Sequence, residues 1–175
     1  MKQIFKISNL LSTLRILLAV PLFIFLSKEN YYAVMAICLI AYVTDLLDGY
    51  FARKLNQISE LGKILDPLAD KVFVFVLALQ LLVQGKIPVW FFVVIVSRDV
   101  LILLGGLFMK DKAKSVPASN MYGKITVIIV AVTLVLSMLN IVKYEYMNYL
   151  MLLALCGLLL SFCVYLNRFI KLFKK

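Results

Sequence analysis

Long apolar stretches alternate with short polar connections along nearly the whole sequence. A helix needs about 20 largely apolar residues to cross the hydrocarbon core of a membrane. Stretches of that kind lie at roughly residues 8–27, 31–52, 64–84, 87–109, 121–142 and 147–168. The pattern predicts an all-α integral membrane protein with six transmembrane helices, forming a single membrane domain over residues 1–175.

The first stretch also has features of a signal peptide, because Lys2 and Lys6 precede it. Arg15 and Pro21 interrupt its apolar run, and no clear small-residue cleavage site follows. We therefore expect this segment to be retained as the first helix.

Composition supports the membrane assignment and narrows the chemistry. Hydrophobic residues make up 64% of the chain, against about 45–50% in soluble domains. The sequence contains no histidine, which excludes imidazole bases and His-containing zinc sites. Cys38, Cys156 and Cys163 all lie in apolar stretches without a CxxC pair, so we assign them to packing.

Basic residues predict the orientation in the membrane, because short basic loops stay on the cytoplasmic side. With both termini inside, only Lys28, Lys86 and Lys143 of the 19 basic residues fall in outer loops. This asymmetry predicts a bacterial-type inner (cytoplasmic) membrane protein with both termini and the active site cytoplasmic. The net charge of +10 then favours anionic membrane lipids as partners and not nucleic acid.

Acidic residues are concentrated where the second and third predicted helices meet the cytoplasm. Asp45 and Asp48 are spaced i, i+3, and Asp66 and Asp70 are spaced i, i+4, so each pair shares one helical face. Four carboxylates near hydrocarbon repel one another and require compensating charge. Hard oxygen ligands select Mg²⁺ or Mn²⁺, so the pattern predicts a site for one or two divalent cations.

The residues between the two acidic pairs point to a phosphate-bearing ligand. Gly49 and Ala52 remove side-chain bulk near the acids, and Arg53 supplies a planar cation that matches phosphate geometry. Gly62 and Pro67 shape the start of the third predicted helix, which carries the second acidic pair. Together these residues suggest a nucleoside diphosphate.

This segment reproduces the signature of the CDP-alcohol phosphotransferases. The matching pattern is Asp45-x₂-Asp48-Gly49-x₂-Ala52-Arg53-x₈-Gly62-x₃-Asp66-x₃-Asp70. The segment from Ser8 to Arg15 also resembles bacterial members of that family. The resemblance implies the CDP-alcohol phosphotransferase fold, commonly a homodimer, with a cytoplasmic cavity open to lipid. In that cavity CDP-diacylglycerol would give its phosphatidyl group to an alcohol and release CMP.

Roles follow from the resemblance position by position. Asp70 would take the proton from the attacking hydroxyl, and Arg53 would contact the diphosphate. The two divalent cations, Mg²⁺ or Mn²⁺, would be held by Asp45, Asp48, Asp66 and Asp70. The CDP moiety would be bound by Gly49, Ala52, Arg53 and Gly62.

Three other basic residues are candidates for binding the acceptor, because cations within membrane spans often serve function. These are Arg15, Arg98 and Lys124. Arg98 has an alternative role as a packing element paired with Asp99, and Lys124 has one as a marker of the membrane boundary.

The acceptor itself stays open between two alternatives. Length, the N-terminal segment and the run from Leu65 to Lys71 resemble bacterial phosphatidylglycerophosphate synthases, which use glycerol 3-phosphate. Those enzymes often carry a second arginine where this chain has Gly106, whereas Arg98-Asp99-Val100 resembles cardiolipin synthases, which use phosphatidylglycerol. Lys110, Lys112 and Lys114 could replace the missing charge, and glycerol 3-phosphate is the favoured acceptor.

Other classes of protein explain less of the pattern. Structural ion pairs between the acids and Arg53, Lys54, Lys63 or Lys71 would not require the glycines or the regular spacing. A cation transporter would carry polar residues along a path through several spans, but the fifth and sixth stretches contain few. A purely structural membrane protein leaves the signature unexplained.

Overall fold

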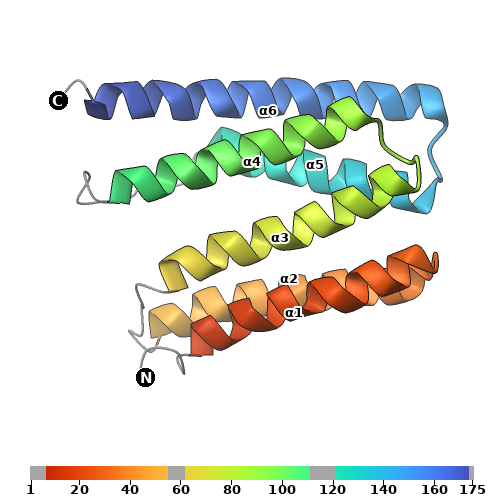
Figure 1. Cartoon of the computed structure of the whole chain (residues 1–175), viewed down its shortest axis with the longest axis horizontal. Helices are drawn as coiled ribbons and strands as arrows, with labels where there is room; N and C mark the ends of the chain where they lie inside the picture. The colour runs from red at the N-terminus through yellow and green to blue at the C-terminus, as the bar shows by residue number, and fades with distance from the viewer. Residues whose placement is uncertain (1–6, 55–61, 111–120, 174–175) are drawn as a thin grey trace. The chain divides into compact units, whose positions relative to one another are not determined.

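The chain folds into helices that match the six apolar stretches (Figure 1). The structure is a computed structural model that describes residues 7–54, 62–110 and 121–173. Over these residues it contains no strand. The helices are α1 (Ile7–Ser27), α2 (Tyr31–Lys54), α3 (Gly62–Val83), α4 (Val89–Lys110), α5 (Met121–Leu139) and α6 (Tyr144–Phe173). The predicted all-helical class is therefore confirmed.

Length and composition alone mark two of these helices as able to cross a membrane. They are Asn9–Ser27 and Tyr144–Asn167, while Tyr31–Leu47 and Gly123–Leu139 are shorter apolar helices. This statement covers the described residues only. Six transmembrane helices therefore remain a prediction.

Several helix ends differ from the predicted ones, and local backbone chemistry explains two of these shifts. The fourth helix begins at Val89 and not at 87, because Pro88 precedes it and its carbonyl accepts the Phe91 N–H at 3.1 Å. The fifth ends at Leu139 and not at 142, because Asn140 has a φ of 53°. A left-handed residue of this kind closes a helix, and asparagine tolerates it.

The described chain divides into two compact units, Met1–Gln80 and Leu81–Lys175. The expectation of a single domain is not decided by this division and stays a prediction. Each unit is described separately below.

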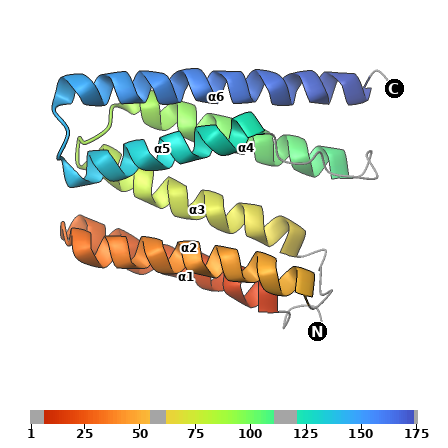
Figure 2. The same cartoon turned by 180° about the vertical axis from the view of Figure 1, so that it is seen from behind.

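In the first unit, α1 and α2 pack side by side (Figures 1 and 2), and α3 meets α1 through the polar side-chain contacts described below. The turn between α1 and α2 is tight because Glu29 adopts a φ of 54° and the Asn30 side chain accepts the Ala33 N–H at 3.2 Å. The apolar core of this unit comprises Ala19, Leu22, Leu26, Val34, Ile37, Ala41, Ala69, Leu77 and Ala78.

Helices α1 and α3 run in the same direction with a nearly constant offset along the sequence. Ser12 donates to Asp66, Arg15 donates to Asp70, and Gln80 Nε2 donates to Ser27 Oγ at 2.8 Å. These pairs are separated by 54, 55 and 53 residues along the chain. Polar contacts at both ends therefore fix how α3 is placed along α1.

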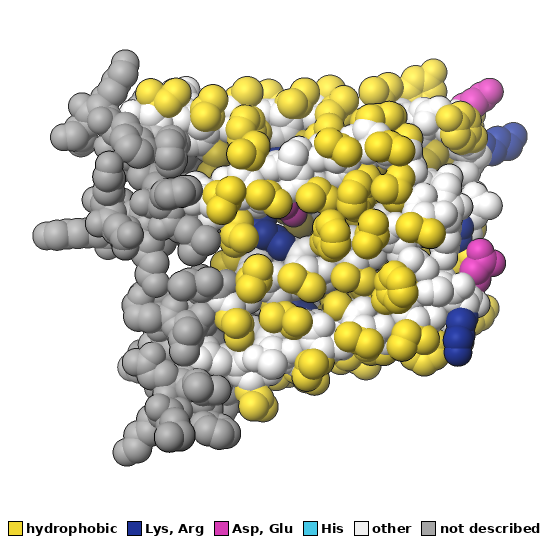
Figure 3. Space-filling model, viewed as in Figure 1, with side chains coloured by type: hydrophobic (Ala, Val, Ile, Leu, Met, Phe, Trp, Pro, Cys, Tyr) yellow, Lys and Arg dark blue, Asp and Glu magenta, His cyan; other side chains and the backbone are white. Residues whose placement is uncertain are grey.

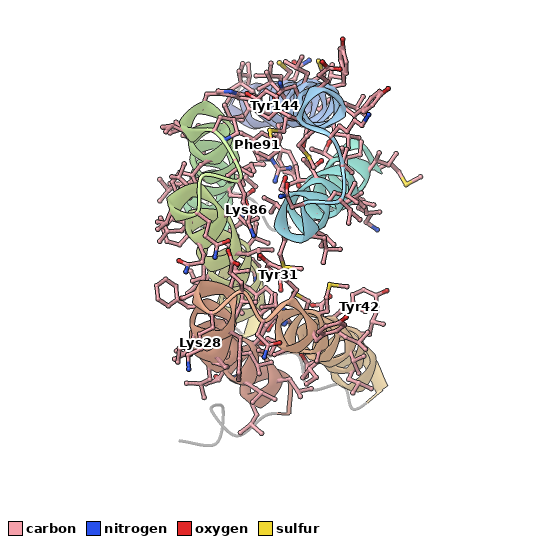
Figure 4. The ribbon with its side chains drawn as sticks, turned by 90° about the vertical axis from the view of Figure 1, so that its right-hand side faces the viewer. Lys28, Tyr31, Tyr42, Lys86, Phe91 and Tyr144 are labelled. Atoms are coloured by element: carbon pink, nitrogen blue, oxygen red, sulfur yellow. The ribbon has the colours of Figure 1, made fainter. Side chains whose placement is uncertain are left out.

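In the second unit, α6 packs against both α4 and α5 (Figures 1 and 2). Thr126 Oγ1 on α5 donates to the Gly157 carbonyl of α6 at 3.0 Å. A Cβ atom at Gly157 would lie 3.1 Å from Thr126 Oγ1, so glycine permits this close approach. At the other end of α5, Lys86, which is labelled in Figure 4, donates from its Nζ to the Met138 carbonyl at 3.2 Å.

Large apolar side chains remain exposed along the helices. Leu17 is 60% exposed and Leu160 is 62% exposed, and Figure 3 shows apolar side chains distributed along the helices in view. Soluble monomers rarely expose apolar surface to this extent, because water disfavours it. A lipid environment accounts for this surface, as expected of a membrane protein.

Candidate active site

One face of α1 is buried from end to end but changes in character along its length. Its first part presents Asn9, Ser12 and Arg15, and its later part presents Ala19, Leu22 and Leu26. All six are buried, at the three- and four-residue spacing of a single helical stripe. Buried polar side chains need hydrogen-bond or ionic partners, because burying them unpaired is unfavourable.

Two residues of this polar stripe, Ser12 and Arg15, have acids of the signature as partners. Ser12 Oγ donates to Asp66 Oδ1. Arg15 Nη1 contacts Asp70 Oδ1 and also lies 3.1 Å from Asp45 Oδ1. Acids from two different helices, α2 and α3, are therefore gathered on α1.

Burial differs sharply between the donors and the acids. The Arg15 side chain is only 3% exposed, whereas those of Asp45 and Asp70 are 49% and 54% exposed. Each acid is thus held on one side by α1 and remains accessible on another. An ionised carboxylate has about four lone-pair sites, so it can accept further ligands beside Arg15 or Ser12.

This arrangement fits a divalent cation. Among the described side chains, the carboxylates of Asp45 and Asp70 contact one guanidinium, that of Arg15, while Asp66 accepts from the uncharged Ser12 hydroxyl. Their oxygen ligands are those that Mg²⁺ and Mn²⁺ prefer. Among the described side chains, no three acids are close enough to form a complete metal site. The fourth acid, Asp48, is not among them.

The rest of the signature is placed only by its backbone. Asp48, Gly49, Ala52 and Arg53 continue α2 beyond Asp45, and Gly62 is the first residue of α3. Asp48 therefore lies one helical turn from Asp45, as the spacing predicts. The roles assigned to these four residues and to Gly62 fall outside the described side chains and stay predictions.

Arg98 belongs to a separate cluster in the second unit. Its Nη1 lies 2.7 Å from Asp99 Oδ1, and its Nη2 donates to Ser161 Oγ at 2.8 Å. Gly123 and Tyr165 border the same place, because a Cβ at Gly123 would lie 3.9 Å from Arg98 Nη2 and 3.8 Å from the Tyr165 ring. The pairing of Arg98 with Asp99, considered from sequence as an alternative, is thus present.

Sequence reasoning missed Ser161 and Tyr165. Ser161 follows Gly157 by four residues on α6, and a buried serine in an otherwise apolar stretch was the available signal. Arg98 Nε is buried and has no hydrogen-bond partner among the described atoms. Lys124, the residue after Gly123, is exposed. Arg98 and Lys124, two of the three cations predicted to meet the acceptor, therefore differ in burial.

Comparison with known proteins finds matches over most of the chain. A family model described as CDP-alcohol phosphatidyltransferase matches residues 5–163. The CDP-diacylglycerol–glycerol-3-phosphate 3-phosphatidyltransferase of Aquifex aeolicus is 36% identical over 146 residues, covering 82% of each chain.

Two further relatives match shorter segments. The protein of the same name from Bacillus subtilis is 47% identical over 88 residues, covering 50% of this chain and 45% of the relative. The cardiolipin synthase (CMP-forming) of Rattus norvegicus is 39% identical over 112 residues, covering 63% of this chain and 37% of the relative. The extent of the family match and of the Aquifex aeolicus alignment shows that the chain belongs to the CDP-alcohol phosphatidyltransferase family.

Proposed function

We propose that this chain transfers the phosphatidyl group of CDP-diacylglycerol to glycerol 3-phosphate and releases CMP. The observation that carries the proposal is the gathering of Asp45, Asp66 and Asp70 on the buried polar stripe of α1. The Aquifex aeolicus relative, which matches over most of both chains, carries glycerol 3-phosphate in its name. Family membership also favours a transferase over a cation transporter.

Two divalent cations, Mg²⁺ or Mn²⁺, are proposed to be held by Asp45, Asp48, Asp66 and Asp70. When bound, they would neutralise negative charge on the diphosphate and on the departing CMP. The convergence of Asp45 and Asp70 on Arg15, with Asp66 held by Ser12 of the same helix, supports this assignment.

The chain's own groups account for the proton and for the position of the donor. The acceptor hydroxyl oxygen forms a bond to the phosphorus next to diacylglycerol, and the bond from that phosphorus to the CMP oxygen breaks. Asp70 takes the hydroxyl proton, for which its half-exposed carboxylate is accessible. Arg53 contacts the diphosphate, while Gly49, Ala52 and Gly62 leave room for the CDP moiety.

The proposed acceptor site uses Arg98 and Lys124. Arg98 offers a buried N–H without a described partner, which suits a phosphate oxygen. Arg15, also predicted from sequence to meet the acceptor, contacts the acids, so less of its charge is available for a phosphate.

Cardiolipin synthesis is the second candidate, with phosphatidylglycerol as acceptor. The match to the Rattus norvegicus cardiolipin synthase supports it, as does Gly106 at the position of an expected second arginine. That match covers only part of the relative, whereas the Aquifex aeolicus match is extensive. We therefore favour glycerol 3-phosphate.

The arrangement in the cell is proposed from the sequence pattern. Six spans with both termini and the active site cytoplasmic would place the protein in a bacterial-type inner membrane, where anionic lipids attract its basic residues. A homodimer is proposed because members of the family commonly form one.

The decisive experiment supplies purified protein with Mg²⁺ or Mn²⁺ and CDP-diacylglycerol, together with either glycerol 3-phosphate or phosphatidylglycerol. Mass spectrometry identifies the lipid product, and CMP release measures turnover. We expect phosphatidylglycerophosphate to form from glycerol 3-phosphate. Cardiolipin from phosphatidylglycerol alone would favour the second candidate, and no acceptor-dependent CMP release would contradict both.

A further inference from the structure

The contacts of α1 suggest that this helix does more than contribute a membrane span. Ser12 and Arg15 lie three residues apart on α1, and they contact Asp66 and Asp70, which lie four residues apart on α3. In parallel helices such spacings rise by about 4.5 and 6 Å, so two donors on one face match two acceptors on the other. The third contact, between Ser27 and Gln80, keeps the same register at the far end.

Arg15 also joins the two halves of the signature. Its Nη1 contacts Asp70 of α3 and lies 3.1 Å from Asp45 of α2. Two carboxylates brought together repel each other, and a cation between them offsets that repulsion. The distance between these two acids is therefore determined in part by a buried residue of a third helix.

Helix α1 covers only one side of these acids, so another side stays accessible to ligands. Ser12 is fully buried and the Arg15 side chain is 3% exposed, while Asp45 and Asp70 are about half exposed. A buried donor holding a more exposed carboxylate is the relation found between metal ligands and the groups that orient them.

We infer that Ser12 and Arg15 are positioning residues that orient Asp66, Asp70 and Asp45 as ligands of a small divalent cation and restrict their movement. This inference rests on the proposed function, because it takes these acids as metal ligands. Mg²⁺ requires short, nearly octahedral contacts of about 2.0–2.1 Å, whereas Ca²⁺ accepts about 2.3–2.6 Å in flexible geometry. Acids whose movement is restricted therefore favour the ion that demands strict geometry over the larger, more tolerant one.

The test measures cation binding without any lipid substrate, so it does not depend on activity. Mn²⁺ binding to purified full-length protein is followed by electron paramagnetic resonance, and Mg²⁺ and Ca²⁺ are added as competitors. Ser12→Ala removes a donor without changing charge. Loss of a group that orients a metal ligand typically costs about 10- to 100-fold in metal affinity, and we expect Mn²⁺ binding to weaken by about tenfold.

Arg15→Met gives a second, independent variant. Removing a positive charge raises the affinity for every divalent cation to a similar degree, so the informative quantity is the ratio of Ca²⁺ to Mg²⁺ affinity. We expect that ratio to rise at least about fivefold, because loosened acids tolerate the larger ion. Arg15→Lys retains the charge and should give a smaller rise.

Ser27→Ala is the matched control. It removes the hydrogen bond from Gln80 at the far end of the same two helices and leaves the acids untouched. Its Mn²⁺ affinity and its Ca²⁺ to Mg²⁺ ratio should equal those of the wild type. An equal shift in this variant would assign the effect to general loosening of α1 against α3 and would overturn the inference.

The remaining outcomes separate this inference from the proposed function. If Ser12→Ala binds Mn²⁺ as tightly as the wild type and Arg15→Met keeps the wild-type ratio of Ca²⁺ to Mg²⁺ affinity, α1 does not position the ligands, although the metal site itself stands. If the wild type binds no divalent cation at all, the metal assignment fails and the inference fails with it.

Discussion

At the scale of single residues, Asp70 unites the features that a proton acceptor in this site requires. It contacts Arg15 and has a side chain that is 54% exposed. The resemblance assigned it two roles, metal ligand and base, and the structure gives it a neighbour that the resemblance did not include. Arg15 was selected from sequence as a cation for the acceptor, but its described contacts are with the acids.

Replacing Asp70 with asparagine should stop the reaction while leaving the fold intact. The amide cannot take a proton, and a positioned general base contributes about 10²–10⁴-fold to a rate. CMP release from CDP-diacylglycerol should therefore fall by at least about 10²-fold. Glu145→Gln, an exposed acid at the start of α6, is the control. Wild-type turnover in Asp70→Asn would contradict the assignment of the base.

Replacing Arg53 with lysine should weaken use of the donor. Lysine keeps the charge but lacks the planar fork that matches a diphosphate. Hydrogen bonds to charged groups contribute about 1.5–3 kcal/mol, so we expect the KM for CDP-diacylglycerol to rise about tenfold. Steady-state kinetics with the donor varied would measure this. Unchanged KM and kcat would argue against contact between Arg53 and the diphosphate.

At the scale of helices, polar residues within apolar segments determine which helices meet. Ser12 and Arg15 connect α1 to α3, and Thr126 connects α5 to α6 through the Gly157 carbonyl. Small residues and buried hydroxyls are common where membrane helices approach closely, because lipid provides no hydrophobic force between helices. The same principle explains why Gly157 lies opposite Thr126.

Replacing Gly157 with valine should destabilise the second unit. A Cβ atom there would lie 3.1 Å from Thr126 Oγ1 and 3.4 Å from Thr126 Cγ2, so the helices would have to separate. Overpacking of this kind costs about 1–3 kcal/mol. Thermal unfolding in detergent should show a lower midpoint. The double variant Gly157→Val with Thr126→Ala should recover part of the loss, and a double variant no more stable than Gly157→Val would argue against the clash.

At the scale of the whole molecule, the exposed apolar surface and the family agree on a membrane protein. Two helices have the length and composition of membrane spans, and the six-span arrangement remains a prediction from hydropathy and basic residues. The basic residues make that arrangement testable, because they assign Lys28, Lys86 and Lys143 to one side.

Cysteine labelling should distinguish the two sides of the membrane. In a variant lacking Cys38, Cys156 and Cys163, a single cysteine is introduced at Lys28, Lys143 or Lys112. A membrane-impermeant maleimide should label the first two in intact cells and the third only after permeabilisation, because the predicted outer loops face away from the cytoplasm. Labelling of Lys112→Cys in intact cells would contradict the predicted orientation.

The sequence by itself determined the helical class, the approximate helix positions and the acidic signature. Apolar stretches of membrane length specify helices, because in lipid a helix makes the backbone hydrogen bonds that its own segment needs. Spacings of three and four residues specify which acids share a face, because the helical period is fixed. Helix ends were less well predicted, since they depend on local groups such as Pro88 and Asn140.

Tertiary structure decided which distant residues meet. Nothing in the linear pattern pairs Ser12 with Asp66, or Arg15 with both Asp45 and Asp70, because these contacts depend on the register between helices. The same holds for Ser161, which contacts Arg98 across the second unit. Local spacing depends on one helix alone, whereas contact between helices depends on how whole faces pack, and only the folded chain determines that.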